Sequence, residues 1–333
     1  MKYYYQVEGD VRNNIGDVLQ GMVAKAFLPA DSLVADREDL ASIDKNQPGF
    51  LVANGWYMHS FDKFPPPANV TPLYLSVHVA NSALFQRAEV REHFKKNGPI
   101  GCRDHKTLKL FLGWGIPAYY SGCLTVTSNA RSPINVSGKG ECLLVDNVDH
   151  PIPENVKIKL ETLLGEKLTR VSHDPPDTTG SLQEYDKKAT AHMEMLLERY
   201  CKARIVLTTK IHCALPSLGM GANVALIHPD PTDPRLDTLR EFTEIVSYDQ
   251  ILAMTTFELP KVDKTALANR RNFLSKVVKQ GAESISNPIS TIAEYKSIKR
   301  SSAIKAMLYR QAIKVLLLVG ASQQITRVYK SRE

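Results

Sequence analysis

Short apolar segments alternate along this chain with longer segments whose apolar residues recur at the spacing of a helix. In the first part, strands are expected at residues 50–57, 73–79, 100–102 and 118–120, and helices at 18–27 and 104–114. Parallel strands joined by crossover helices produce this order, and such helices cover both faces of the sheet. The alternation therefore predicts an α/β fold built on parallel strands.

A polar segment rich in Ser, Asn and Gly interrupts the alternation at residues 128–140, and a second series follows it. Its strands are expected at residues 141–145, 168–172, 204–209 and 223–228, and its helices at 154–164, 181–203, 214–220 and 264–280. A chain of 333 residues is long enough for about two domains. We expect two doubly wound, Rossmann-type domains facing a central cleft, over residues 1–138 and 139–285, and a basic helical extension over residues 286–333.

The positive charge of the chain is concentrated at its end. The net charge is +7, but nine Lys or Arg and one acidic residue lie between residues 296 and 333, so residues 1–295 carry a net charge of −1. A nearly neutral body argues against a nucleic-acid groove, which needs cations along the fold. Apolar residues between the cations of the tail predict peripheral contact with an anionic membrane surface. The alternative is a helix that packs back on the first domain with its charges in water.

The cysteines and histidines indicate neither a disulfide framework nor a metal site. Five cysteines lie far apart without a C-x-x-C pair, and no H-E-x-x-H spacing occurs. We expect the cysteines to be small core residues. No segment approaches the roughly 20 apolar residues of a membrane span, and the first residues lack the apolar run of a signal peptide. The expected location is the cytoplasm.

Residues 207–218 place a cation and an imidazole where a buried strand gives way to a helix. The strand is expected to stop before Lys210, and His212 follows at the turn into the helix. In open α/β sheets, ligands bind at the carboxyl ends of the strands, and helix N-termini favour anions. His212 could act there as a general acid near neutral pH. The alternative is a surface lysine beside a capped core histidine.

Two further segments place polar groups at expected helix starts. Asn14, Gly16 and Asp17 open the first helix, where glycine lets a ligand approach the backbone. Simple capping by Asn14 and Asp17 explains the same pattern. Arg103 follows the strand at residues 100–102, and its planar guanidinium suits a carboxylate or phosphate. A salt bridge to a neighbouring acid is the alternative for Arg103.

Seven segments that follow one another between residue 13 and about residue 235 form a set. They read NNIGD (13–17), NGWYMHS (54–60), PLYLSVHV (72–79), GPIGCRD (98–104), SGCLTVT (121–127), SHD (172–174) and LTTKIHCALPSLGMGANV (207–224). Together they resemble the polysaccharide pyruvyl transferase family. The resemblance implies a GT-B-like fold and an enzyme that transfers the carbon skeleton of phosphoenolpyruvate to a sugar as a pyruvate ketal. Phosphoenolpyruvate is then a co-substrate, and neither a cofactor nor a metal is required.

The resemblance also implies which residues bind the donor. The family carries Arg-x-His after a strand of the second domain, which matches Lys210 and His212, and an arginine that matches Arg103. In the family these basic groups grip the donor anion, and lysine at position 210 lacks the bidentate geometry of arginine. Gly16 and Asn14 complete the expected donor site.

For the chemistry, we assign His212 as the acid that protonates the methylene carbon of the donor. Asp17 is the expected base at the sugar hydroxyl, with His78 or His173 behind it. His78 and His173, which lie at expected strand ends, and Asn54 are the candidates for acceptor binding. Each of these histidines taken alone is more often structural.

The expected acceptor is a sugar of a surface polysaccharide, such as an exopolysaccharide or capsule, or of its lipid-linked precursor. Two other interpretations stay open. One is a glycosyltransferase of the same fold that uses a nucleotide-sugar. The other is a non-enzymatic glycan-binding protein with a decayed site, which the lysine at position 210 keeps open.

Overall fold

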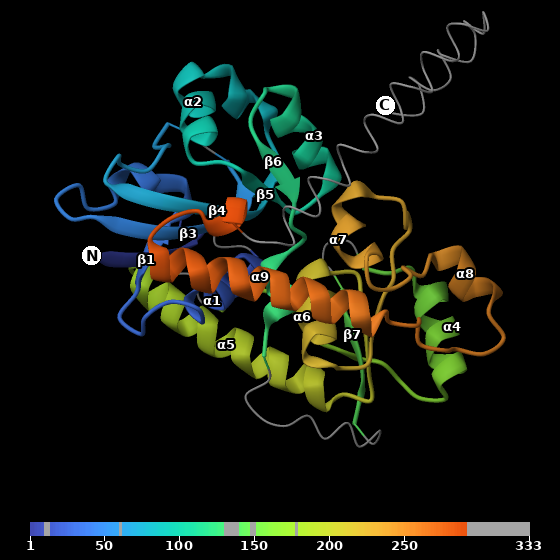
Figure 1. Cartoon of the computed structure of the whole chain (residues 1–333). Helices are drawn as coiled ribbons and strands as arrows, with labels where there is room; N and C mark the ends of the chain where they lie inside the picture. Colours follow the sequence, from blue (N-terminus) through green and yellow to red (C-terminus); the bar gives the residue numbers. More distant parts are fainter. Residues whose placement is uncertain (10–13, 60–61, 130–139, 147–150, 177–178, 292–333) are drawn as a thin grey trace, which may run out of the picture. The chain divides into compact units, whose positions relative to one another are not determined.

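The computed structural model describes residues 1–9, 14–59, 62–129, 140–146, 151–176 and 179–291 (Figure 1). The chain divides into two compact units, Met1–Asn287 and Pro288–Glu333. Of the second unit only the 3-10 turn η5 (Pro288–Thr291) is described. The predicted basic helix of the tail, and most of the predicted linker at residues 128–140, lie outside the described residues.

The first sheet has six strands, all paired in parallel, in the order β2-β1-β3-β4-β5-β6. Strands β3 and β4 are buried along most of their length, because helices and turns cover both faces. The strands are β1 (Lys2–Val7), β2 (Leu33–Asp36), β3 (Gly49–Tyr57), β4 (Val70–Val79), β5 (Ile100–Cys102) and β6 (Ala118–Tyr120). The helices and 3-10 turns of this part are α1 (Ile15–Lys25), η1 (Arg37–Ser42), η2 (Ser82–Gln86), α2 (Ala88–Lys96), α3 (His105–Gly113) and η3 (Leu124–Thr127).

The second sheet has four parallel strands in the order β10-β9-β7-β8. They are β7 (Cys142–Val145), β8 (Thr169–Arg170), β9 (Ile205–Thr208) and β10 (Val224–Leu226). The helices and turns of this part are α4 (Glu154–Leu164), α5 (Leu182–Lys202), α6 (Ile211–Met220), η4 (Pro234–Leu236), α7 (Asp237–Arg240), α8 (Tyr248–Ala253) and α9 (Lys264–Ser284). The predicted α/β fold with parallel strands is therefore confirmed, and it is Rossmann-like.

Strands β1 and β2 were not predicted from the sequence. The β1 segment KYYYQV contains three tyrosines in place of an aliphatic run, although aromatic residues favour strands as strongly. The β2 segment LVAD is only four residues long. Because both strands were missed, so were the residues that follow them.

The two series of elements pack on one another within the first unit (Figure 1). Helix α5 lies against α1, and the Tyr5 hydroxyl of β1 donates a hydrogen bond of 2.6 Å to Asp186 of α5. Helix α9 returns to the first sheet, where a Cβ on Gly281 would lie 2.9 Å from the side chain of Leu73. Both sheets thus belong to one compact unit, and the boundary at residues 138 and 139 stays a prediction, as does the GT-B arrangement.

All five cysteines are free and buried, as expected for core residues. Among the residues described, no helix combines the length and apolar character that crossing a bilayer requires.

Candidate active site

The carboxyl ends of the strands bring most of the candidate residues to the edges of the two sheets. Glu8, Arg37, His59, His78 and Arg103 lie at the ends of β1 to β5 or within two residues after them. Lys210 follows β9 in the second sheet in the same way. Carboxyl ends of parallel strands meet at one edge of a sheet, which is where α/β proteins bind ligands.

Helix α6 begins with its N-terminus uncapped. It starts at Ile211, three residues before the predicted start, because Lys210 has the extended backbone of an N-cap residue. The Lys210 side chain cannot accept a hydrogen bond, and no side chain caps this helix. The N–H groups that precede Cys213 in the first turn can therefore face an anion.

His212 lies in this first turn against the start of α1. A Cβ on Gly16 would lie 2.9 Å from Cγ of His212 and would overlap Nδ1, so only glycine leaves room for the ring. The ring is mostly buried, and its Nε2 has no hydrogen-bond partner among the residues that the structure describes. Glycine at position 16 thus allows the His212 side chain to approach the backbone of α1. Nε2 of His212 is available to a ligand.

Burial and the neighbouring charges keep the ring of His212 neutral. Burial lowers the pKa of His212 to about 4, with Arg103 and His78 acting in the same direction and Asp17 opposing them. The same interactions show that residues from three separate predicted motifs face one another here. His212 is therefore neutral near pH 7 and has no proton to donate in this environment.

Arg103 is buried at the turn between β5 and α3. Its backbone N–H donates to the carbonyl of Val77 at 2.8 Å, which fixes the residue beside β4. The Nε of Arg103 has no hydrogen-bond partner, and no ion pair joins this residue to another within the described ranges. The salt-bridge alternative is therefore not seen there, and the cation is available to an anion.

His78 and Asp104 form a pair next to Arg103. Nδ1 of His78 lies 2.6 Å from Oδ2 of Asp104, whose Oδ1 accepts a hydrogen bond of 2.8 Å from the N–H of Thr107. Burial raises the pKa of Asp104, but the hydrogen bond and charge of His78 outweigh it, and the pKa is lowered. The carboxylate thus caps α3 and orients the His78 ring.

Asn14 and Asp17 are both held at the start of α1. The side chain of Asn14 accepts a hydrogen bond of 3.0 Å from the N–H of Gly16, so the capping interpretation describes this residue. Oδ1 of Asp17 accepts a hydrogen bond of 2.8 Å from Gln20 and lies 3.3 Å from Arg37. Burial raises the pKa of Asp17, but Arg37 and His212 more than offset this, and Asp17 remains a carboxylate.

Asn54 and His173 are both buried. The amide nitrogen of Asn54 donates a hydrogen bond of 3.0 Å to the carbonyl of Gln20, which ties β3 to α1. Nδ1 of His173 lies 2.9 Å from the Tyr200 hydroxyl, and its Nε2 has no partner among the residues described. Burial, together with Lys210 and His212, lowers the pKa of His173 to about 3. His173 thus adjoins the site, whereas the contacts of Asn54 are structural.

Four charged or titratable residues of the site were not among the predicted ones. They are Glu8, Arg37, Glu38 and His59. Arg37 lies within 3.3 Å of the carboxylates of Glu8, Asp17 and Glu38, and His59 lies 2.8 Å from Glu8. The strand signal of the tyrosines in β1 could have led to Glu8, since a polar residue at a strand's carboxyl end is a site candidate.

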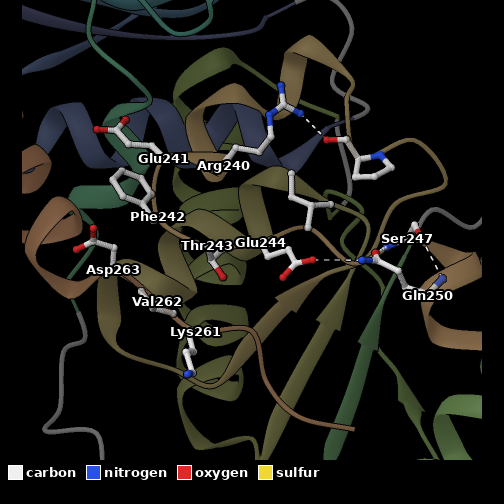
Figure 2. A pocket seen from close by; sticks show the side chains of 12 residues that line it. Arg240, Glu241, Phe242, Thr243, Glu244, Ser247, Gln250, Lys261, Val262 and Asp263 are labelled. Carbon is white, nitrogen blue, oxygen red and sulfur yellow. Dashed lines mark hydrogen bonds between the residues drawn. The ribbon is translucent and has the colours of Figure 1, made fainter. Parts of the chain in front are cut away.

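A separate cavity of about 760 Å³ lies in the second series, between α7, α8 and the start of α9. Figure 2 shows Glu244 inside it, with a hydrogen bond of 3.2 Å from Gln250. None of the candidate site residues lines this cavity. The candidate active site at the carboxyl ends of the strands is therefore separate from this cavity.

The fold and this cluster define a Rossmann-like α/β protein with a basic, histidine-containing site at the carboxyl ends of its strands. Residues 14–231 match the sequence profile described as polysaccharide pyruvyl transferase. The chain belongs to the polysaccharide pyruvyl transferase family, as the sequence motifs indicated.

Other comparisons add little to this. A crystal structure of a functionally uncharacterized protein from Klebsiella pneumoniae is similar with a TM-score of 0.42 and 9% identity, over 72% of this chain and 87% of that one. No curated protein matches this chain in sequence.

Proposed function

We propose that this protein transfers the pyruvyl group of phosphoenolpyruvate to two hydroxyls of one sugar, forming a pyruvate ketal on a surface polysaccharide or its lipid-linked precursor. Membership of the family supports transfer to a polysaccharide. The observation that carries the finer proposal is the free Nε2 of His212 beside Arg103, at the uncapped start of α6.

The donor carries a phosphate and a carboxylate, so it requires several positive groups. Arg103 has no ion-pair partner among the described residues, and Lys210 stands at the start of α6. The N-terminus of α6 adds its dipole and free N–H groups. The N-terminus of α1 contributes less, because Asn14 already occupies the N–H of Gly16.

Donor binding allows His212 to take up the proton that its role as an acid requires. The pKa of His212 is about 4 because burial and Arg103 disfavour the imidazolium. A bound anion neutralises Arg103 and adds negative charge beside the ring, which raises this pKa. His212 then takes up a proton and delivers it to the methylene carbon of the donor.

The remaining steps need two proton acceptors. Asp17 takes the proton of the first sugar hydroxyl as its oxygen bonds to the central carbon of the donor. Phosphate then leaves, and the second hydroxyl adds to the same carbon and loses its proton to the departing phosphate. His78, oriented by Asp104, stands behind Asp17 in this scheme.

Phosphate release from phosphoenolpyruvate, measured with a panel of alkyl hexopyranosides and oligosaccharides, tests the proposal when mass spectrometry identifies the ketal. His212→Gln is expected to reduce the rate by about a hundredfold or more, since general acids contribute on this scale. The matched control is His93→Gln. It removes another partly buried histidine of lowered pKa, which is hydrogen-bonded to Tyr74 of β4. Full activity of His212→Gln would overturn the assignment of the acid.

The two other interpretations give different results. A thermal shift with nucleotide-sugars, and none with phosphoenolpyruvate, would favour a glycosyltransferase. If Lys210→Arg, which restores the bidentate group of the family, gained no transfer activity in an inactive wild-type protein, a glycan-binding role would follow.

A further inference from the structure

Arg37 lies at the centre of a buried charge cluster at the carboxyl ends of β1, β2 and β3. Its nitrogens lie 3.2 Å from Glu8, 3.3 Å from Asp17 and 3.3 Å from Glu38. All four side chains are at most 5% exposed. The cluster adjoins the proposed active site, because Asp17 also interacts with His212 and Arg103.

Three carboxyl groups lie against one guanidinium in this cluster. Ionising all three so close together and away from water is strongly unfavourable. Carboxyl groups in this situation retain a proton and share it. Burial, Asp17 and Glu38 raise the pKa of Glu8 to about 8 despite Arg37, whereas the pKa of Asp17 is lowered. Glu8 is therefore the member that holds the proton.

His59 connects this cluster to solvent. Its Nε2 lies 2.8 Å from Oε1 of Glu8, and its side chain is 38% exposed. Its backbone N–H donates to Glu38 at 3.0 Å, and its ring meets Trp56 edge-on with centroids 4.7 Å apart. These contacts hold the imidazole between the buried carboxyl and water.

We propose that Glu8 and Asp17 share one proton above Arg37, and that His59 exchanges this proton with solvent. The proposal rests on the proposed function, in which Asp17 is the base. When the sugar O–H bond breaks, its proton goes to Asp17, the proton of Glu8 passes to Nε2 of His59, and Nδ1 of His59 releases one to water. The proton on Asp17 then moves to Glu8, which restores the carboxyl pair, and His59 regains its Nδ1–H tautomer by exchanging protons with water. Glu8, Arg37 and His59 are positioning and relay residues, since none of them touches substrate.

Infrared spectra of the full chain without substrate test the shared proton when the wild type is compared with its variants. The wild type is expected to show the carbonyl band of a buried, protonated carboxyl near pH 7, and Glu8→Gln to lack it. Asp17→Asn should also lose the band near pH 7, because Glu8 then shares Arg37 with Glu38 alone and ionises. Asp146→Asn is the matched control, since Asp146 is a buried carboxylate paired with Arg170 outside the cluster. A band that is the same in all four proteins would overturn the proposal, and Asp17→Asn decides it if Glu8→Gln does not fold.

The relay is tested by phosphate release from phosphoenolpyruvate with the same alkyl hexopyranosides. His59→Gln is expected to slow turnover by about tenfold or more, and added imidazole to restore it. Glu8→Gln should slow turnover without rescue, because imidazole cannot enter the buried cluster. Turnover of His59→Gln at the wild-type rate would refute the relay. If the wild type itself releases no phosphate with any sugar, the proposed function fails, while the infrared result still decides whether the proton is shared.

Discussion

At Gly16 the backbone of α1 lies against the ring of His212. A methyl group there would overlap Nδ1 and lie 2.9 Å from Cγ, so the ring would have to move. Since proton delivery depends on placement within a fraction of an ångström, we expect Gly16→Ala to lower turnover by about a hundredfold. Phosphate release and a urea unfolding curve on the same sample measure the two effects.

The control for this substitution is Gly113→Ala at the end of α3. A Cβ at Gly113 meets nothing within 4 Å, so this variant should keep full turnover. Its stability should change by no more than about 1 kcal/mol, because alanine suits a helix better than glycine. Equal turnover of Gly16→Ala and Gly113→Ala would show that the position of the His212 ring does not matter.

Donor binding should be accompanied by proton uptake at His212. The ring is neutral, with a pKa of about 4, and a bound anion raises that pKa. Affinity for phosphoenolpyruvate is therefore expected to strengthen as pH falls. Calorimetry at about pH 8, above the second pKa of a phosphate ester, in two buffers of different ionisation enthalpy counts the protons. His212→Gln should abolish the difference between buffers, and an absence of any difference in the wild type would contradict the acid role.

At the scale of residues, the sequence named candidates that the structure brings together, while their roles stay predictions. His212, Arg103, His78 and Asp17 interact with one another, and each lies at a strand end or a helix start, where local sequence signals are clear. Glu8 was not named, since its partners Arg37 and His59 are distant in sequence and only the sheet brings them together. The neutral state of His212 also could not be predicted, because it depends on burial and on Arg103.

At the scale of elements, the Asp104 carboxylate caps α3 and also orients His78. Asp104 bonds the N–H of Thr107 at 2.8 Å and lies 2.6 Å from His78. Asp104→Ala is expected to cost about 1–2 kcal/mol of stability through the lost cap and to lower turnover. Asp104→Asn should keep most of the stability, because asparagine caps helices well, while still lowering turnover since His78 loses its carboxylate.

A cap that lies away from the site provides the comparison. Ser247 caps α8 through a reciprocal pair of hydrogen bonds with Gln250. Ser247→Ala should cost about 1 kcal/mol in urea unfolding and leave turnover unchanged. If Asp104→Asn also left turnover unchanged, the His78–Asp104 pair would have only a structural role.

Element boundaries followed the sequence closely wherever local signals decide them. The predicted strands of both series lie within three residues of the observed ones, and the helices expected at residues 104–114 and 181–203 begin after the capping residues Asp104 and Ser181. The packing of α9 on the first sheet was not predicted, because it depends on long-range contacts such as that of Tyr119 with Phe273. Periodicity gives an amphipathic helix but not the surface that it covers.

At the scale of the whole molecule, the uneven charge predicts contact with anionic lipid through the tail. Residues 296–333 carry a net charge of +8 and lie outside the described residues, so this prediction comes from the sequence alone. The full chain should sediment with vesicles containing anionic lipid, less so at high salt, whereas a chain ending at Lys296 should not. Equal sedimentation of both chains would favour a tail that packs on the protein.

Buried titratable groups determine how the stability of the fold depends on pH. Burial lowers the pKa of His212, His173 and His93 to about 4, 3 and 4, so these rings are neutral in the fold. On unfolding each ring regains its ordinary pKa of about 6.5 and binds a proton at lower pH, which favours the unfolded state. Glu8 and Asp186 act in the opposite direction, because their raised pKa values mean that the fold holds protons which the unfolded chain releases.

The free energy of unfolding is therefore expected to be greatest near about pH 6.5 and to fall on both sides. On the acid side, three histidines opposed by one or two carboxyls leave a slope of about 0.5–2.5 kcal/mol per pH unit between roughly pH 6 and 5. On the alkaline side Glu8, with a pKa of about 8, gives a decrease of at most about 1.4 kcal/mol per unit as pH rises toward 8. Urea unfolding at four pH values measures both slopes, with Glu8→Gln flattening the alkaline side and His173→Gln the acid side. A free energy that kept rising from pH 7 to pH 5 would mean that the buried histidines are charged in the fold, and the neutral state of His212 would then have to be abandoned.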